Sequence, residues 1–282
     1  MNMNKSACNM IAHNNREAVY LTFPSFEKYT FVNHAFSTRC GGVSQNEYAS
    51  MNLNFGRGDP VENVIQNYRI FCDAAGFNFD TLVASSQDHH TFVRRVDSSN
   101  LGTGIWRPKD LTSVDGLITN APNVTLVTYY ADCVPLFFLD PEKRAIGLSH
   151  AGWRGTVAQI GKITVEAMTR EFGSRPQDIV AAVGPSIGPC CFEVDAPVYE
   201  EFLKLEDLRP REIIAEKSGG KYNIDLWEAN RRSLISAGIL ESQITVAKLC
   251  TRCNSDWLYS HRASGGKRGG LAAMMCITEG KE

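Results

Sequence analysis

Two apolar runs separated by a short polar turn constrain the fold of this chain more than any other feature. The runs are Val134–Leu139 and Ala145–Leu148, and the turn between them, Asp140–Lys143, contains proline and three charged residues. This pattern predicts an antiparallel β-hairpin. Antiparallel pairing would bring Cys133, just before the first run, next to His150, just after the second. A thiol and an imidazole in one place support either metal ligation or nucleophilic catalysis.

A turn of small residues follows the hairpin. Gly152–Gly155 leads into a predicted helix from about Thr156 to Phe172, with apolar residues on one face and Gly173 at its end. The free backbone N–H groups at the start of this helix would face His150. They are therefore a candidate oxyanion or phosphate site.

Length and composition are typical of one integrated globular domain. The chain has 282 residues, of which 43% are hydrophobic and 21% charged. Predicted strands outnumber helices, and both hairpins and βα units occur, so we expect an α/β or α+β class with mixed sheets. We expect residues 1–30 to be a poorly ordered N-terminal extension and lead-in, and 31–282 to be the domain.

One predicted helix begins with Asp59 as N-cap and ends at Gly76.

Charge and cysteine usage restrict the location and the partners. There are 29 basic and 31 acidic residues, a balance that gives no general attraction to nucleic acid or to anionic membranes. No apolar run reaches the ~18 residues of a membrane helix, and the N-terminus lacks a signal-peptide core. The nine cysteines follow no regular disulfide framework. We therefore expect a cytoplasmic protein with reduced thiols.

The supply of histidines limits the kind of metal site. A multicopper oxidase needs more imidazole than the six histidines present, and it uses His-x-His pairs that this chain lacks. A single zinc site that uses two histidines and one cysteine needs no more ligands than the sequence contains. Cys133 and His150 with either His89 or His90 would provide three ligands and leave a fourth position open, as in catalytic zinc sites.

Two other readings of the cysteines compete with this one. In a metal-free cysteine amidohydrolase or deamidase, Cys133 would be the nucleophile and His150 its base. Cys250-x-x-Cys253 could be half of a zinc site, but no second C-x-x-C completes it, so we expect free thiols there. The adjacent pair Cys190-Cys191 is expected to shape its loop rather than react.

Eight segments, spread over almost the whole chain, together resemble one known family. They are Ser37–Ser44, Tyr48–Asn54, Gln87–His89, Asp115–Thr119, Ala131–Pro135, His150–Gly155, Gly184–Glu193 and Asp225–Arg231. From about Phe31 to Ile277 the sequence is similar to the laccase-domain family, first labelled polyphenol oxidase and now regarded as purine nucleoside phosphorylases.

The resemblance implies a fold, a metal site and a reaction. It implies a zinc site of His89, Cys133 and His150, and it selects His89 over His90 because the family pattern is Gln-x-His. It implies phosphorolysis of adenosine, inosine, guanosine or methylthioadenosine, with deamination of adenosine as a second activity. The implied fold is an α/β sandwich of mixed sheets similar to the catalytic domain of cytotoxic necrotizing factor toxins. Those toxins are Cys–His deamidases, so the metal-free reading has a structural relative.

If the protein is a zinc-dependent phosphorylase, further residues are expected to position the site and to bind phosphate. Asp132, beside a metal ligand, would orient the site or shuttle protons. Phosphate would need cationic donors, for which Arg39, Arg154 and Arg262 are candidates. We expect purine nucleoside and phosphate as small-molecule partners, without nucleic acid or membrane, and the sequence leaves the oligomeric state open. Copper at the same site, with weak phenol oxidation, is a third alternative.

One departure from the family pattern bears on substrate choice. The family usually has Arg-Arg-Asp-Gly near the C-terminus, where this chain has Arg262, Ala263, Ser264 and Gly265. If the missing Asp binds base or ribose, nucleoside preference would differ here.

Overall fold

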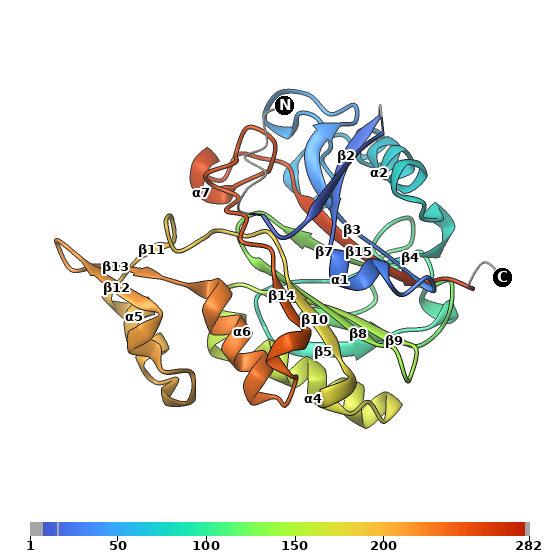
Figure 1. Cartoon of the computed structure of the whole chain (residues 1–282). Coiled ribbons are helices and arrows are strands. Elements are labelled where there is room, and N and C mark those ends of the chain that lie inside the picture. The colour runs from blue at the N-terminus through green and yellow to red at the C-terminus, as the bar shows by residue number, and fades with distance from the viewer. Residues whose placement is uncertain (1–7, 16, 280–282) are drawn as a thin grey trace.

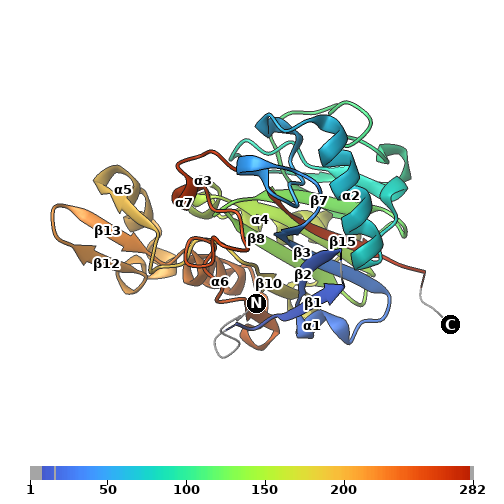
Figure 2. The same cartoon turned by 90° about the horizontal axis from the view of Figure 1, so that it is seen from above.

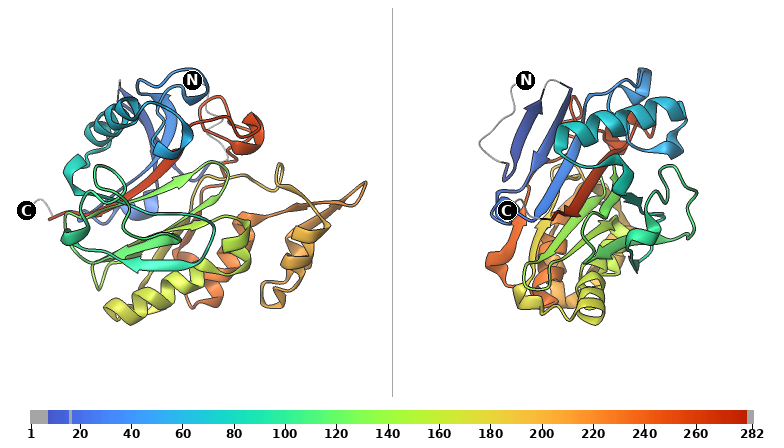
Figure 3. Two further views of the ribbon diagram at one scale, coloured as in Figure 1. Left: turned by 180° about the vertical axis from the view of Figure 1, so that it is seen from behind. Right: turned by 90° about the vertical axis from the view of Figure 1, so that its right-hand side faces the viewer.

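Two packed β-sheets, each covered by helices on its outer face, form the body of the molecule (Figures 1 and 3). The computed structural model describes residues 8–15 and 17–279. Both large sheets are mixed, with parallel and antiparallel neighbours, so the mixed α/β class expected from the sequence is confirmed.

The first sheet has the strand order β1-β2-β3-β15-β7-β4. Its strands are β1 (Ile11–Asn15), β2 (Ala18–Thr22), β3 (Val32–Gly41), β15 (Leu271–Ile277), β7 (Thr125–Tyr130) and β4 (Leu82–Ala84). Only β4 runs parallel to its neighbour, β7. The strand nearest the C-terminus, β15, therefore lies inside the sheet and pairs with β3 and β7.

The second sheet has the order β14-β10-β8-β9-β6-β5. Its strands are β14 (Ile244–Val246), β10 (Val180–Val183), β8 (Val134–Asp140), β9 (Ala145–Ala151), β6 (Val114–Thr119) and β5 (Phe92–Arg95). The pairs β10–β14 and β5–β6 are parallel. The predicted hairpin is confirmed as β8 and β9, with Pro135 opposite His150.

Both faces of the central strands are buried, because one face meets the other sheet and the opposite face meets helices. Along β8, Phe137 and Leu139 belong to the core between the sheets, whereas Leu136 and Phe138 pack toward the helices. This alternation follows from the two-residue period of a strand. Because both faces of β8 are buried, its sequence is a continuous apolar run.

The helices differ in which layer they cover. They are α1 (Pro24–Glu27), α2 (Val61–Ala75), α3 (Trp153–Val157), α4 (Ile160–Phe172), α5 (Ala196–Leu203), α6 (Leu226–Ser236) and α7 (His261–Ser264). Helix α2 packs on the first sheet, and α4 and α6 pack on the second. A small third sheet, β11 (Glu193–Asp195), β13 (Lys221–Ile224) and β12 (Ile214–Lys217), projects to one side with α5 (Figures 1 and 2).

Two predicted helix boundaries are wrong. Asp59 does not cap α2; its carboxylate accepts hydrogen bonds from Ser44 Oγ and Asn52 Nδ2, at 2.5 and 2.9 Å, and Pro60 is the N-cap. The helix predicted from about residue 156 is two helices, because Gln159 adopts a left-handed conformation with φ of 55° between α3 and α4.

The N-terminal segment also differs from the prediction. The sequence predicts a poorly ordered lead-in over residues 1–30, but β1 and β2 extend the first sheet from residue 11 onward, and α1 follows them. Residues 1–7 lie outside the described part. Among the described residues, none of the helices combines the length and the apolar run needed to cross a bilayer.

Candidate active site

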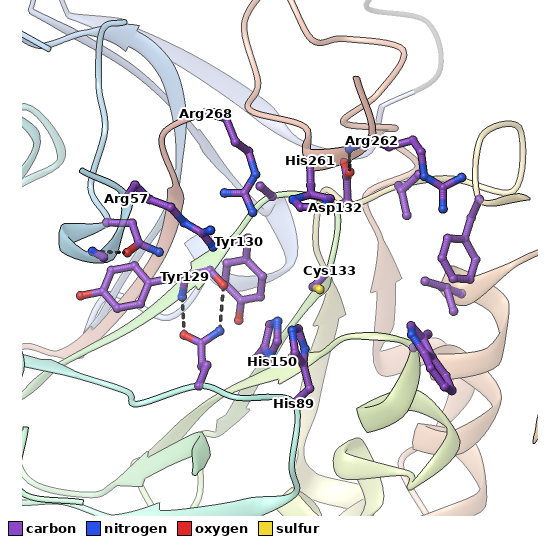
Figure 4. A pocket seen from close by; sticks show the side chains of 18 of the residues that line it. Arg57, His89, Tyr129, Tyr130, Asp132, Cys133, His150, His261, Arg262 and Arg268 are labelled. Carbon is purple, nitrogen blue, oxygen red and sulfur yellow. Dashed lines mark hydrogen bonds between the residues drawn. The ribbon is translucent and has the colours of Figure 1, made fainter. Parts of the chain in front are cut away.

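A pocket of about 610 Å³ opens at the end of the β8–β9 hairpin that carries Cys133 and His150 (Figure 4). This volume lies within the range of ordinary small-molecule sites. Residues from distant parts of the sequence line it, from Asn54 to Arg268. The pocket is therefore a product of the tertiary fold.

Three side chains on one wall of the pocket meet as a group. One ligand atom each of His89, Cys133 and His150 lies within 4.8 Å of the others, and the two imidazole rings are 4.9 Å apart between centroids. In Figure 4 the two rings lie side by side below the cysteine sulfur. His90 is outside this group, because its Nδ1 lies 2.6 Å from Asp88 Oδ1 at the surface. The arrangement offers two nitrogens and one sulfur to a cation such as zinc.

Asp115, on β6, fixes the positions of both histidines. It is fully buried, and its Oδ1 lies 2.7 Å from Nδ1 of His150. The same carboxylate accepts backbone N–H groups of Asp88, His89 and His90 at 2.9–3.2 Å. Because Nδ1 of His150 is engaged, Nε2 is the ring nitrogen left for a ligand. Asp115 belongs to the segment Asp115–Thr119 that resembles the family, but the sequence alone does not reveal this function.

Local backbone geometry brings the three side chains together. His89 and Asp132 have φ of 70° and 89°, a left-handed conformation that is uncommon for residues other than glycine. Gly152 packs directly against the group: a Cβ there would lie 2.8 Å from Nδ1 of His89 and 3.2 Å from Sγ of Cys133. Only glycine therefore fits at this position without displacing these side chains.

The electrostatics favour a charged thiolate–imidazolium pair. Burial alone would raise the pKa of Cys133, but the neighbouring His150 and His89 outweigh burial and lower it to about 6. Burial alone would lower the pKa of His150, but Cys133 and Asp115 raise it to about 9. A thiolate at neutral pH is both a metal ligand and a nucleophile.

The carboxylate of Asp132 accepts hydrogen bonds from two segments in the C-terminal part of the chain, the loop that contains Thr251 and the start of α7. Its Oδ1 accepts a hydrogen bond from Thr251 Oγ1 at 2.6 Å, and its Oδ2 accepts the backbone N–H of Arg262 at 2.7 Å. Asp132, which directly precedes Cys133, thereby holds both segments next to the pocket.

The three arginines predicted to bind phosphate lie in different places. Arg262 lines the pocket, although its guanidinium also donates to the carbonyl of Glu193 at 3.0 Å. Arg39 lines a separate surface hollow, where it donates to the carbonyl of Ala49 at 2.9 Å. Arg154 is exposed and lies over the ring of Trp153, outside the pocket lining. The structure thus brings only Arg262 to the pocket.

Two arginines that the sequence analysis missed do line the pocket. Figure 4 shows Arg57 and Arg268 pointing into it opposite the histidines. Arg268 is 7% exposed, and its Nε has no hydrogen-bond partner among the described residues. Burial and the nearby Arg57 lower the pKa of Arg268 to about 10. For Arg268 the signal in the sequence was the basic, glycine-rich segment 261–270, whereas Arg57 lies outside that segment.

The two positions that depart from the family pattern lie away from this pocket. Ala263 and Ser264 line the same surface hollow as Arg39 and are exposed. Neither of these two side chains therefore lines the pocket that contains Cys133.

Fold and site together define a mixed α/β protein with a His–Cys–His group suited to a metal ion at one wall of a small-molecule pocket. Residues 33–278 match the family model described as multi-copper polyphenol oxidoreductase laccase. The chain belongs to this laccase-domain family, as its motifs indicate.

Named relatives and a solved structure agree with this membership. The chain is 37% identical over 258 residues to a purine nucleoside phosphorylase of Bacteroides thetaiotaomicron, with 91% of this chain and 96% of that protein covered. It is 35% identical to adenosine deaminase RL5 of an unknown prokaryotic organism, with 82% and 88% covered. The crystal structure of the hypothetical protein YfiH of Bacillus licheniformis superposes with a TM-score of 0.89 at 32% identity, covering 95% of this chain and 99% of that one. Relatives with this similarity support an enzyme of this family.

Proposed function

We propose that this protein is a zinc-dependent purine nucleoside phosphorylase that also deaminates adenosine. The observation that carries the proposal is the group of His89, Cys133 and His150 facing two arginines across one pocket. The names of the relatives, one a purine nucleoside phosphorylase and one an adenosine deaminase, support the same two reactions.

The residues present fit a zinc ion. Imidazole and thiolate are ordinary zinc ligands, and three protein ligands leave a fourth position open, as in catalytic zinc sites. Gly152 leaves the space that a Cβ would fill between His89 and Cys133. When bound, zinc would act as a Lewis acid and lower the pKa of a coordinated water toward ~7. Asp115 would hold His150 in the tautomer that presents Nε2.

Arg57 and Arg268 are the groups we assign to phosphate. Both carry positive charge into the pocket, and Arg268 is buried with an unpartnered Nε. A buried donor without a partner costs free energy, which an anion bound there would offset. This assignment replaces Arg39 and Arg154 as phosphate ligands. Arg262 remains at the rim of the pocket.

Another part of the lining suits a purine. Trp153, Phe192 and Ile187 provide apolar and aromatic surface against which a flat base can stack. In phosphorolysis a phosphate oxygen bonds to the anomeric carbon of ribose, the bond from that carbon to the purine nitrogen breaks, and the purine takes up a proton. The arginines orient the phosphate and neutralise its charge. Asp132 acts as a positioning residue, because one of its oxygens holds the loop of Thr251 and the other holds the start of α7.

Product analysis tests the proposal. Purified protein is incubated with adenosine, with and without phosphate, and the products are separated by chromatography. Adenine with ribose 1-phosphate is expected only when phosphate is present, and inosine in both cases. Formation of none of these products by zinc-loaded protein would rule the proposal out.

A metal-free Cys133–His150 amidohydrolase is the second candidate. The lowered pKa of Cys133 and the raised pKa of His150, each caused in part by the other, are what such a catalytic pair requires. In that case alkylation of Cys133 would abolish amide hydrolysis by protein that contains no metal. His89→Ala would retain most of the activity, because His150 contributes more than His89 to the lowered pKa of Cys133. Zinc dependence together with loss of activity in His89→Ala would exclude it.

A further inference from the structure

Four cysteines outside the pocket form a second cluster. One sulfur each from Cys190, Cys191, Cys250 and Cys253 lies within 4.8 Å of the other three. Cys190 and Cys191 follow β10, and Cys250 and Cys253 follow β14. The sequence predicts free thiols at Cys250 and Cys253 because it has no second C-x-x-C. In the fold, the adjacent pair Cys190 and Cys191 supplies the other two sulfurs.

The sulfur separations match a metal site better than a disulfide. Sγ of Cys253 lies 3.5 Å from that of Cys190 and 3.4 Å from that of Cys191. A tetrahedral ion with zinc–sulfur bonds of about 2.3 Å places its sulfurs roughly 3.8 Å apart, whereas a disulfide requires about 2.05 Å. Thiols are weak hydrogen-bond donors, so these contacts alone offer little reason for four of them to gather.

Backbone hydrogen bonds join the two loops that carry the cysteines. Ser186 accepts the N–H of Thr251 at 3.0 Å and donates its own N–H to the carbonyl of Leu249 at 3.2 Å. The N–H of Gly188 points at Sγ of Cys250 at 3.2 Å. Backbone N–H groups directed at a sulfur are a common support of metal thiolates.

Gly188 is also required sterically. A Cβ there would lie 2.6 Å from the indole of Trp227 and 3.3 Å from Cβ of Cys250. The loop can therefore close over Cys250 only with glycine at this position. Arg252 directly precedes Cys253 in the chain, so a cation adjoins the sulfurs. It would offset part of the negative charge of four thiolates around a divalent ion.

We propose that Cys190, Cys191, Cys250 and Cys253 bind a structural zinc ion, separate from the ion proposed at His89, Cys133 and His150. Four thiolates close the coordination sphere, so this ion has no open position for a substrate. It would lock two loops that form part of the pocket, because Ile187 and Phe192 of the first line it and Thr251 of the second holds Asp132.

Metal analysis of the whole chain tests the proposal. Protein purified under reducing conditions should contain about two zinc ions per chain. Cys253→Ser and Cys250→Ser should each lose one of them, and His89→Ala should lose the other. Cys8→Ser, which changes a half-buried cysteine outside the cluster, should retain both. An unchanged zinc content in Cys253→Ser would overturn the proposal.

A second measurement keeps the test valid if a cysteine variant does not fold. Cobalt is exchanged into the His89→Ala protein, and its absorption spectrum is recorded. Tetrahedral coordination by four thiolates is expected, seen as strong sulfur-to-cobalt charge-transfer bands that the Cys253→Ser, His89→Ala double variant lacks. A spectrum without thiolate bands, or a disulfide from Cys253 to Cys190 or Cys191 in reduced protein, would contradict the site.

The zinc contents also separate the two proposals. If wild type and His89→Ala both hold one zinc ion and Cys253→Ser holds none, the structural site is supported and the proposed zinc ion at His89, Cys133 and His150 is refuted.

Discussion

At the scale of single residues, Asp115 has more influence on the site than any ligand taken alone. One buried carboxylate holds three consecutive backbone N–H groups and the ring of His150. Its role was hidden in the sequence because Asp115 is 26 residues from His89 and 35 from His150. The pairing of β6 with β9 brings Asp115 to His150, and a β-bridge between Ser86 and Val114 brings it to His89.

Asp115→Asn should weaken zinc binding at His89, Cys133 and His150 by about 10–100-fold, because the amide cannot replace the carboxylate as acceptor for all of these N–H groups. Competition with a chelator measures the affinity. Asp110→Asn, which removes a carboxylate from an exposed ion pair with Arg94, is the matched control. Equal affinities in the two variants would refute the role of Asp115.

His34 predicts a pH dependence of stability. It is buried beside Phe23 and Phe26, and its Nε2 accepts the N–H of Phe23 at 2.7 Å. Burial, with a smaller contribution from His13, lowers its pKa from 6.5 to about 4. Because the folded-state pKa is below the unfolded value, the stability it contributes is complete above pH 6.5 and is lost as pH falls toward 4.

Wild-type protein should therefore lose about 2 kcal/mol of unfolding free energy from this group between pH 7 and pH 5. His34→Gln keeps an acceptor near the position of Nε2 but does not titrate in this range, so its loss should be smaller by that amount. Denaturant unfolding at both pH values measures the difference. The same loss in wild type and variant would show that His34 is not responsible.

At the scale of elements, the apolar runs in the sequence predicted the hairpin of β8 and β9, because every residue of these two strands is buried. It did not predict β1, whose residues His13, Asn14 and Asn15 are polar. β1 is an edge strand held by backbone pairing with β2, and such pairing leaves little trace in composition. The break between α3 and α4 at Gln159 was missed for a similar reason, since a single left-handed residue does not interrupt an apolar pattern.

The turn from β9 to α3 carries its own prediction. Gly152→Ala should lower zinc content at the pocket, because the new methyl group would occupy the space between His89 and Cys133. Metal analysis and a thermal unfolding curve separate lost ligation from lost folding. Gly56→Ala, where the nearest atom to a new Cβ is Asn54 Oδ1 at 3.5 Å, should retain the metal. A Gly152→Ala protein with full zinc content would contradict this account of the turn.

At the scale of the whole molecule, the pocket combines segments that the sequence keeps far apart. Leu53 donates its N–H to the carbonyl of Gly270, and Gly270 donates to Oδ1 of Asn52, which joins the loop of Arg57 to that of Arg268. The local motifs predicted His89, Cys133 and His150 as a set through family resemblance. The two arginines could not be predicted, because their proximity depends on the central position of β15 in the first sheet.

Arg268→Gln should reduce phosphorolysis by about 10–100-fold, since a charge-assisted contact to phosphate contributes roughly 1.5–3 kcal/mol. Deamination of adenosine needs no phosphate and should fall much less. Arg170→Gln on the exposed face of α4 is the control, and both rates should be unchanged in it. Equal losses of both reactions in Arg268→Gln would argue against a phosphate site there.

We propose that zinc at His89, Cys133 and His150 is needed for cleavage of purine nucleosides. The most direct test removes all metal from the protein, returns zinc in steps, and follows adenine release from adenosine and phosphate. We predict that the metal-free protein is inactive and that activity rises with zinc bound at these three residues, with no such rise in His89→Ala. Metal-free protein that cleaves adenosine as fast as the zinc-loaded form would contradict the account.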